Sequence, residues 1–224
     1  MSSLVKICGV TDPAALAAAL TAGADMVGFV SFPPSPRHLA LDEAAALAAA
    51  ARGRARRVLL LVDPSDAELD AAVAAIAPDL LQLHGHETPE RLAAVRRRTG
   101  LPVAKAVGIA GPDDLAAVAA FRAVADRILL DAKAPAGATR PGGNGAAFDW
   151  TLLRGAELGP GAMLSGGLDP GNVAAAIAAT GLRAVDVSSG VESRPGVKDP
   201  AKIAAFVAAS RAAFAALDDT RQVA

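Results

Sequence analysis

The sequence predicts an α/β fold, a single (β/α)8 barrel of the TIM type in which eight parallel strands alternate with eight helices. Short apolar runs recur at near-regular spacing, and Ala- and Leu-rich stretches of helical period separate them. Strict alternation of this kind implies parallel strands joined by crossover helices. An open doubly wound sheet has the same local pattern, but its G-x-G-x-x-G fingerprint after the first strand is absent here.

The expected strands are short apolar runs, and the expected helices are the Ala-rich stretches between them. The strands span residues 4–8, 26–30, 58–62, 80–83, 103–107, 128–130, 162–164 and 184–187. The helices span residues 13–22, 42–51, 66–76, 89–98, 112–122, 149–155, 170–179 and 200–217. Four helix starts place a capping oxygen before a first-turn proline: Asp12-Pro13, Thr88-Pro89, Asp169-Pro170 and Asp199-Pro200. We expect one domain over residues 1–224, without a linker and with a frayed tail at 218–224.

Composition excludes several classes of function. A hydrophobic fraction of 53% predicts a sizeable core rather than disorder. The net charge of −1 provides no strong field for nucleic acid or for an anionic membrane. We place the local basic runs at helix C-termini, where cations complement the helix dipole. These runs are Arg52, Arg54, Arg56 and Arg57, and Arg96 to Arg98.

The cysteine count and the hydropathy pattern predict a cytoplasmic protein. One cysteine cannot form an internal disulfide, which favours a reducing compartment. The N-terminal sequence MSSLVKICGV contains no long apolar run of a signal peptide. The Ala-rich stretches are apolar on average, but charged residues interrupt them every few positions. We therefore expect amphipathic helices and no membrane span.

Polar residues interrupt the apolar strands near their C-terminal ends, where side chains of a barrel face the active-site mouth. Alternation places Lys6 with Cys8 on one face, Gln82 with His84, and Asp186 with Ser188, while Asp131 ends the sixth strand. A free cysteine is most often a small buried hydrophobe, and a strand-end Asp can simply cap the next loop. The shared phase of these residues nevertheless favours one polar site.

The two strand lysines are interpreted as structural. We expect Lys6 to pair inside the barrel with a carboxylate, that of Asp186 on the neighbouring last strand. Lys105 is of the kind that Schiff-base aldolases use, but it stands about two residues before the end of its strand.

Two glycine-rich turns predict a phosphate site. LSGGLDPGNV (164–173) follows the seventh strand and DVSSGVESRPGVKD (186–199) the eighth. Glycines allow backbone N–H groups to approach an anion, a short helix start beyond Ser189-Gly190 would add its dipole, and barrels often hold phosphate at this place. No P-loop lysine pattern is present, so we expect a phosphorylated small molecule rather than a nucleoside triphosphate. The alternative is that the glycines serve only tight turns.

Two further loops lie at the same predicted mouth. SFPPSPRHL (31–39) is stiffened by three prolines, so it fixes the direction of Arg37, which suits a carboxylate; the alternative is a surface salt bridge. The long segment 134–150 is either a mobile cover over the site or merely disordered. His84 and His86 lack a third ligand in strand-end register, so we expect no metal.

Taken together, these segments resemble the phosphoribosylanthranilate isomerase family of tryptophan biosynthesis. The resemblance runs from the first strand to the last helix, and the combination of motifs is specific although each piece alone is not. The matching segments are VKICGVTD (5–12), GFVSFPPSPR (28–37), LQLHGHE (81–87), LLDA (129–132), GGNGAAFDW (142–150), LSGGLDPGNV (164–173) and VDVSSGVESRPGVKD (185–199).

The resemblance implies a (β/α)8 barrel without a cofactor that performs an Amadori rearrangement of a phosphorylated aminoaldose. It assigns Cys8 as general base, Asp131 as general acid and Arg37 to the anthranilate carboxylate. It places Gly166, Gly167, Ser189 and Gly190 at the phosphate. His84, Asp186 and Ser188, at the same strand ends, are expected to bind substrate. No nucleic-acid or membrane partner is implied, and the chain is expected to be a monomer or a homodimer.

Two departures from the family pattern are mild. Asn144 stands where the family more often has threonine, and the third strand, VLLLVD, lacks the expected phenylalanine.

Three competing hypotheses remain open at this stage. The sister isomerase of histidine biosynthesis carries an aspartate in place of Cys8 and a second phosphate turn after the third strand, where LVDPSDA has no glycine. A Schiff-base aldolase would depend on Lys105. A catalytically inactive, phosphosugar-binding barrel would not need both Cys8 and Asp131.

Overall fold

The strands close into a barrel in sequence order, as predicted. The computed structural model describes residues 3–134, 137, 142 and 147–223, with only the backbone for 220–223. All neighbouring strands pair in parallel, and β1 pairs with β8 to close the ring. The barrel strands are β1 (Leu4–Cys8), β2 (Met26–Ser31), β3 (Arg56–Leu61), β4 (Leu80–Leu83), β5 (Val103–Ile109), β6 (Arg127–Ala132), β7 (Ala162–Leu164) and β8 (Ala184–Val187).

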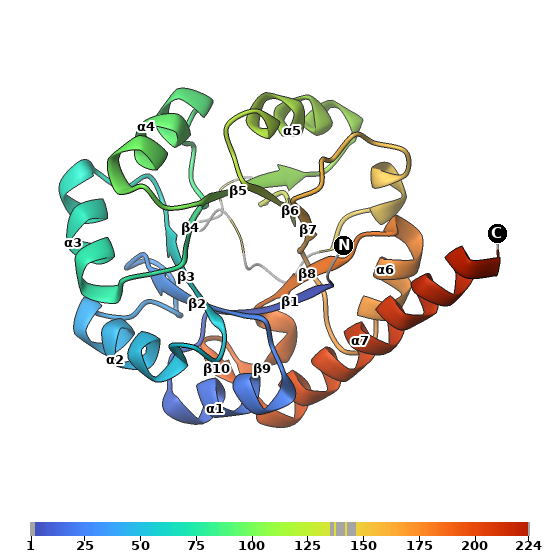
Figure 1. The fold of residues 1–224 in the computed structure, drawn as a ribbon, viewed down its shortest axis with the longest axis horizontal. Coiled ribbons are helices and arrows are strands. Elements are labelled where there is room, and N and C mark those ends of the chain that lie inside the picture. Colours follow the sequence, from blue (N-terminus) through green and yellow to red (C-terminus); the bar gives the residue numbers. More distant parts are fainter. Residues whose placement is uncertain (1–2, 135–136, 138–141, 143–146, 224) are drawn as a thin grey trace.

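The helices cover the outer face of the ring (Figure 1). The α-helices are α1 (Pro13–Ala22), α2 (Leu41–Ala51), α3 (Asp66–Ile76), α4 (Pro89–Thr99), α5 (Leu115–Arg122), α6 (Val173–Thr180) and α7 (Pro200–Val223). The 3-10 turns are η1 (Pro112–Asp114), η2 (Trp150–Leu153) and η3 (Ser189–Val191). A short hairpin, β9 (Glu192–Arg194) with β10 (Val197–Lys198), follows β8 and was not predicted.

Two of the expected helices are wrong in extent. At 149–155 only the 3-10 turn η2 forms, since Asp149 caps it and Gly155, with φ +69°, ends the segment almost at once. At 170–179 the helix begins at Val173, because Asp169 accepts the N–H groups of Gly171 and Asn172 in a separate turn. The stretch 112–122 is divided between η1 and α5.

In the described backbone the predicted tail continues α7 as far as Val223, and one placement of the basic residues is wrong. No glycine or proline follows Pro200, so α7 continues to Val223, and Asp218 on it pairs with Arg183 at 2.6 Å. Arg52 stands at the C-cap of α2 as expected, but Arg56 and Arg57 begin β3. Arg96 to Arg98 do lie in the last turn of α4.

The core has two parts, one on each side of the strands. Outward-facing residues such as Phe29, Leu59 and Leu81 pack beneath the helices. Inward-facing residues, including Met26 and Met163, fill the lower barrel. Successive side chains of a strand point to opposite sides of the sheet, so the position of a polar residue in its strand determines whether it reaches the barrel interior.

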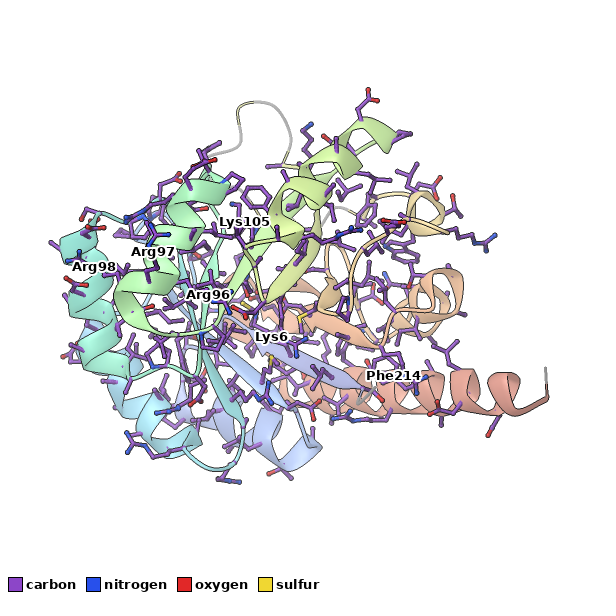
Figure 2. The ribbon with its side chains drawn as sticks, turned by 45° about the horizontal axis from the view of Figure 1, so that its top comes forward. Lys6, Arg96, Arg97, Arg98, Lys105 and Phe214 are labelled. Atoms are coloured by element: carbon purple, nitrogen blue, oxygen red, sulfur yellow. The ribbon has the colours of Figure 1, made fainter. Side chains whose placement is uncertain are left out.

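Helix α7 shows how the apolar helices are used. Residues 200–219 are long and apolar enough to cross a membrane by composition alone. In the structure Ile203, Phe206, Val207 and Phe214 form a buried stripe, and Phe214 lies on the barrel side of the helix (Figure 2). The exposed face carries polar residues such as Lys202, which gives the amphipathic pattern of a surface helix.

Candidate active site

One pocket opens at the C-terminal ends of the strands. It encloses about 810 Å³, counted out to its open mouth. The polar residues that alternation placed on one face of each strand meet there, so the predicted polar site exists as one cavity. Every predicted site residue except Gly190 lines it: Cys8, Arg37, His84, Asp131, Gly166, Gly167, Asp186, Ser188 and Ser189.

Cys8 ends β1 and is only 4% exposed. Its neighbour on β2 is Gly28, and a Cβ there would come within 2.9 Å of the Cys8 sulfur, so glycine provides the space for the thiol. Burial raises the pKa of Cys8; the ammonium of Lys6 acts in the opposite direction, and the carboxylate of Asp186 raises it further.

Lys6 forms the pair that was predicted for it. Its Nζ donates to Asp186 Oδ1 at 2.9 Å, and the two residues are register partners on β1 and β8. The Ser165 hydroxyl donates to the other carboxylate oxygen at 3.5 Å. Burial alone would lower the pKa of Lys6, but Asp186 and Cys8 outweigh it and raise that pKa. A permanent ammonium therefore lies inside the barrel, next to the thiol.

Asp131, the last residue but one of β6, has two polar contacts. Its Oδ1 accepts from the Ala132 N–H at 2.9 Å, and its Oδ2 lies 3.2 Å from His84 Nε2. The Gln82 amide nitrogen is 3.3 Å from His84 Nδ1. An amide can donate only to a ring nitrogen without a proton, so this contact favours the tautomer with the proton on Nε2, the atom that faces Asp131. Gln82 was noted for its phase with His84 but not selected as a site residue.

The segment after β6 contributes one described residue to the pocket. Gly142 lies against His84 and Asp131, and a side chain at this position would collide with both. The predicted cover, 134–150, falls mostly on residues outside the described part of the chain, Asn144 among them.

The two glycine-rich turns meet on one side of the pocket. Gly166 and Gly167 have φ of +79° and +63°, which favours glycine, and neither N–H donates to an acceptor within the described part of the chain. Ser188 and Ser189 line the wall beside them. The predicted helix start is the single 3-10 turn η3, which is too short to provide the dipole of a helix.

Gly190 lies behind this wall. The Leu168 carbonyl packs so closely against it that any side chain would collide. Glycine is needed here for the contact between the two turns, and the structure does not bring Gly190 to the pocket surface.

Arg37 is buried, so the surface salt bridge considered for it is wrong. Its Nε and Nη2 donate to the two carboxylate oxygens of Glu192, at 2.7 and 3.0 Å. Its stem packs on Gly9, where a side chain would collide with it. Arg37 still lines the pocket.

Glu192 and Lys198 were missed by the sequence reasoning. Both are buried on the β9–β10 hairpin, and Lys198 Nζ donates to Glu192 Oε1 at 2.8 Å. The Pro195-Gly196 pair between them is a turn signal that could have predicted the hairpin. Nothing local indicates that its charges pair with Arg37.

Apolar side chains line the wall next to Cys8. Val30 and Leu60 are buried against it, and Phe32 and Val62 extend the wall toward solvent. Apolar surface gains free energy when water leaves it, so this wall is suited to an apolar group of a ligand.

Lys105 lies outside the site, as its structural interpretation predicted. Its neighbours Ala104 and Ala106 face the barrel interior, so Lys105 points outward, and Figure 2 shows it beside α5, apart from Lys6. Its Nζ donates to Glu87 Oε2 at 2.7 Å and to the Gly85 carbonyl at 2.6 Å. A lysine in this position cannot form a Schiff base with a ligand in the pocket.

The two histidines of the H-x-H do not converge. His84 faces Asp131, whereas His86 is exposed and pairs with Asp63. Within the described ranges, no group of three His, Cys, Asp or Glu side chains is arranged to hold a metal ion.

Comparison with known families gives one result along nearly the whole chain. Residues 5–209 match the family model described as N-(5'-phosphoribosyl)anthranilate (PRA) isomerase. An N-(5'-phosphoribosyl)anthranilate isomerase of Azorhizobium caulinodans is 60% identical over 99% of this chain and 97% of its own length. One from Rhodopseudomonas palustris is 61% identical over 93% of this chain and 95% of its own.

Solved structures agree with these sequence relatives. A phosphoribosyl anthranilate isomerase in complex with reduced 1-(o-carboxyphenylamino)-1-deoxyribulose 5-phosphate superposes with a TM-score of 0.82 at 32% identity, covering 95% of this chain and 100% of its own. The Thermotoga maritima phosphoribosyl anthranilate isomerase gives a TM-score of 0.83 at 34% identity, with the same coverage.

Proposed function

The chain belongs to the N-(5'-phosphoribosyl)anthranilate isomerase family of tryptophan biosynthesis, and we propose that Cys8 is the general base and Asp131 the general acid of its reaction. The family's reaction is the rearrangement of N-(5-phosphoribosyl)anthranilate to 1-(2-carboxyphenylamino)-1-deoxyribulose 5-phosphate. The observation that carries the proposal is the pocket itself. Cys8 on β1 and Asp131 on β6 line one cavity together with a glycine-rich turn and Arg37.

The rearrangement needs two proton transfers at different atoms of the sugar. Asp131, protonated, gives its proton to the ring oxygen; the bond from that oxygen to C1′ breaks, and the anthranilate nitrogen lone pair forms an iminium. The Cys8 thiolate then takes the proton from C2′, and the electron pair left behind forms the C1′–C2′ double bond and neutralises the iminium. The enolamine gains a proton at C1′ and loses its C2′ hydroxyl proton, which gives the ketone. Two positioned groups on separate strands supply both transfers.

The buried ammonium of Lys6 supports Cys8 as the base. Burial raises the pKa of the thiol and so reduces the fraction of thiolate, while making the thiolate that does form a stronger base. Lys6 provides a fixed positive charge next to it, which lowers the pKa again. Asp186 keeps that ammonium in place at 2.9 Å.

The two ends of the pocket suit the two anions of the substrate. The N–H groups of Gly166 and Gly167, with Ser188 and Ser189 beside them, would bind the phosphate. Arg37 would meet the anthranilate carboxylate, and the apolar wall at Val30, Phe32 and Leu60 would hold the aromatic ring. Binding at both ends fixes the sugar between base and acid.

The loop after β3 argues against a substrate with two phosphates. Asp63 stands there with φ +46°, and its carboxylate accepts the N–H of His86 at 2.6 Å. An acidic side chain in place of free N–H groups disfavours the substrate of the sister isomerase. The second alternative, an inactive phosphosugar-binding barrel, is disfavoured because Cys8 and Asp131 both reach the pocket.

We place the enzyme in the cytoplasm, acting on a phosphorylated small molecule without nucleic acid, membrane or cofactor. For its assembly we propose a monomer or a homodimer; the structure of one relative, from Thermotoga maritima, is described as monomers generated from a dimeric enzyme.

The test is the turnover of the Cys8→Ala variant, followed by the fluorescence decay of phosphoribosylanthranilate. We expect a loss of about 10²–10⁴-fold in kcat, the range for a removed general base. Binding of the reduced product analogue, measured by calorimetry, should survive, because Cys8 does not hold the phosphate or carboxylate ends. Cys8→Ser is the matched control for size and should be nearly as inactive, since a hydroxyl is a far weaker acid than a thiol. A near-normal kcat in Cys8→Ala would refute the base assignment.

A further inference from the structure

The β9–β10 hairpin places two buried charges between Arg37 and Ser188. Glu192 accepts both hydrogen bonds from Arg37 and one from Lys198. Lys198 Nζ also donates to the Ser188 carbonyl at 2.9 Å and to the Ser188 hydroxyl at 3.2 Å. A continuous chain of charged and polar contacts therefore joins Arg37, at one end, to Ser188, at the other.

Neither hairpin charge is placed to touch a ligand. Among the described residues, Arg37 and Ser188 line the pocket, whereas Glu192 and Lys198 stand behind them. We propose that Glu192 and Lys198 are positioning residues that hold the carboxylate end and the phosphate end of the site in a fixed relation to each other. This inference rests on the substrate ends assigned above to Arg37 and Ser188.

Glu192 determines the direction of the guanidinium. A bidentate pair fixes the plane of Arg37, because both N–H···O bonds must stay in line. It engages Nε and Nη2, so the remaining edge of the guanidinium is the one left for a ligand. A single hydrogen bond in place of two would allow this plane to rotate.

The three charges add up to one surplus positive charge in a buried place. Arg37 and Lys198 are cations and Glu192 is an anion, and all three are less than a tenth exposed. Burying an unbalanced charge is unfavourable unless an opposite charge arrives. A substrate with a carboxylate and a phosphate supplies it, so the same group both attracts the substrate and directs it.

Both ends of the chain of contacts return to the segment that carries the base. The Ser188 hydroxyl donates to the Cys8 carbonyl at 3.1 Å. The Arg37 stem packs on Gly9, the residue after Cys8. A change in the hairpin would therefore shift the substrate relative to the thiol, and not only weaken one contact.

The hairpin is itself anchored to its surroundings. The Gly196 N–H donates to Glu192 Oε2 at 3.2 Å, and the Thr11 hydroxyl donates to the Gly196 carbonyl at 3.0 Å. Lys202 Nζ donates to the Glu192 carbonyl at 2.8 Å. The Thr11 and Lys202 bonds go to backbone carbonyls and use neither the Glu192 carboxylate nor the Lys198 ammonium, so the hairpin can persist when one of those charges is removed.

Removing the negative charge of Glu192 should separate two effects, the attraction of the substrate by the cations and the positioning of those cations. In Glu192→Gln, Arg37 and Lys198 keep their charges but lose the carboxylate that directs them. We expect kcat to fall at least tenfold, while the Kd of the reduced product analogue changes less than threefold or tightens. If Glu192 only stabilises the fold, a smaller fraction of the Glu192→Gln protein should be active. Each active site, counted by titration with the analogue, should then have a normal kcat.

The experiment compares three variants by steady-state kinetics and by calorimetry with the reduced product analogue. Arg194→Gln is the matched control: it removes an exposed charge from the same hairpin and should leave kcat and Kd unchanged. Lys198→Met is the second variant, because it leaves the Arg37–Glu192 pair intact; we expect ribose 5-phosphate to bind at least fivefold more weakly.

Wild-type kcat per active site in Glu192→Gln, or unchanged ribose 5-phosphate binding in Lys198→Met, would overturn the proposal. If Cys8→Ala is inactive and Glu192→Gln is normal, the hairpin proposal alone has failed; an active Cys8→Ala places the failure in the proposed mechanism.

Discussion

Carboxylates at the two ends of the barrel are used in different ways. At the floor, where the strands begin, Asp25, Asp79 and Asp126 stand directly before β2, β4 and β6. Each accepts the N–H of a residue at the start of the preceding strand. The three bonds are Val5 N–H to Asp25 at 2.6 Å, Arg57 N–H to Asp79 at 2.8 Å and Val103 N–H to Asp126 at 2.9 Å.

The floor carboxylates also share a second partner type. Each pairs with an arginine, and each pair is partly open to solvent. The pairs are Arg211–Asp25 at 2.7 Å, Arg57–Asp79 at 2.7 Å and Arg96–Asp126 at 3.0 Å. The same contact is thus made three times, as expected of groups that hold neighbouring strands together.

No such repetition exists among the carboxylates described at the mouth. Asp131 faces a histidine, Asp186 a lysine that reaches the thiol, and Glu192 an arginine and a lysine together. All are buried, and each has different partners. Repeated contacts at the floor indicate stability, and unique ones at the mouth indicate chemistry, which matches the division of labour in this architecture.

The largest expected effect compares two aspartates at opposite ends of β6. Asp131→Asn, at the mouth end of β6, removes the proposed proton donor and should lower kcat by about 10²–10⁴-fold. Asp126→Asn, at the floor end of β6, is the matched control and should keep kcat within about twofold while lowering the melting temperature. Fluorescence decay of the substrate and thermal unfolding measure the two. Equal losses of kcat in Asp131→Asn and Asp126→Asn would contradict the distinction between the mouth and the floor of the barrel.

A smaller effect concerns the pH dependence of kcat/KM. Because burial raises the pKa of Cys8, the thiolate forms and the rate rises at higher pH than for an ordinary thiol. Asp186 also raises that pKa, so Asp186→Asn should move the rising limb to lower pH, whatever the loss in maximal rate. Asp63→Asn removes a carboxylate at the same mouth without contact to Lys6 and should leave the limb in place. A limb that moves upward in Asp186→Asn would contradict Cys8 as the titrating base.

The smallest expected effect on activity is at the floor. Asp79→Ala removes the Arg57 ion pair and the bond from the Arg57 N–H, and should lower the free energy of unfolding by about 1–2 kcal/mol, discounted because Asp79 is partly exposed. kcat should be unchanged. Denaturant unfolding of both proteins measures the difference.

The same variant has a defined pH dependence. The guanidinium of Arg57 holds the pKa of Asp79 below its usual range, so Asp79 stabilises the fold above the unfolded-state pKa of about 3.9 and loses this contribution as the pH falls toward the folded-state value. The stability difference between wild type and Asp79→Ala should therefore shrink below about pH 4. A difference that grows on acidification would show that Asp79 does not act as an anion.

The gathering of polar residues at the mouth could be predicted from the sequence in large part, because it depends on strand periodicity. The phase of polar residues placed Cys8, His84 and Asp131 at one mouth, and it paired Lys6 with Asp186 across the closing strands. The Arg37–Glu192 pair could not be predicted, since its partners stand 155 positions apart and meet only when the hairpin folds back on the barrel. The helix expected at 149–155 failed for a local reason, because Gly155 ends the segment after one turn.

The floor contacts were not predicted either, although the aspartates before β2, β4 and β6 are visible in the sequence. Their partners are backbone N–H groups, which every strand has, so no residue pattern marks them. The prediction that basic residues lie at helix C-termini was likewise wrong for Arg57. This residue lies at the start of β3 and pairs there with Asp79.

The floor bonds also divide the barrel into pairs of strands. β1 with β2, β3 with β4, and β5 with β6 each contain both partners of one carboxylate bond, and none of these bonds spans the connection from β2 to β3. The turn at residues 52–54 is exposed and lies on that connection. New termini could therefore be placed there by circular permutation, and both partners of each carboxylate bond would stay close in sequence. An opening within α1 would instead separate Val5 from Asp25 and convert a local contact into one made only on final closure, which slows folding by raising contact order.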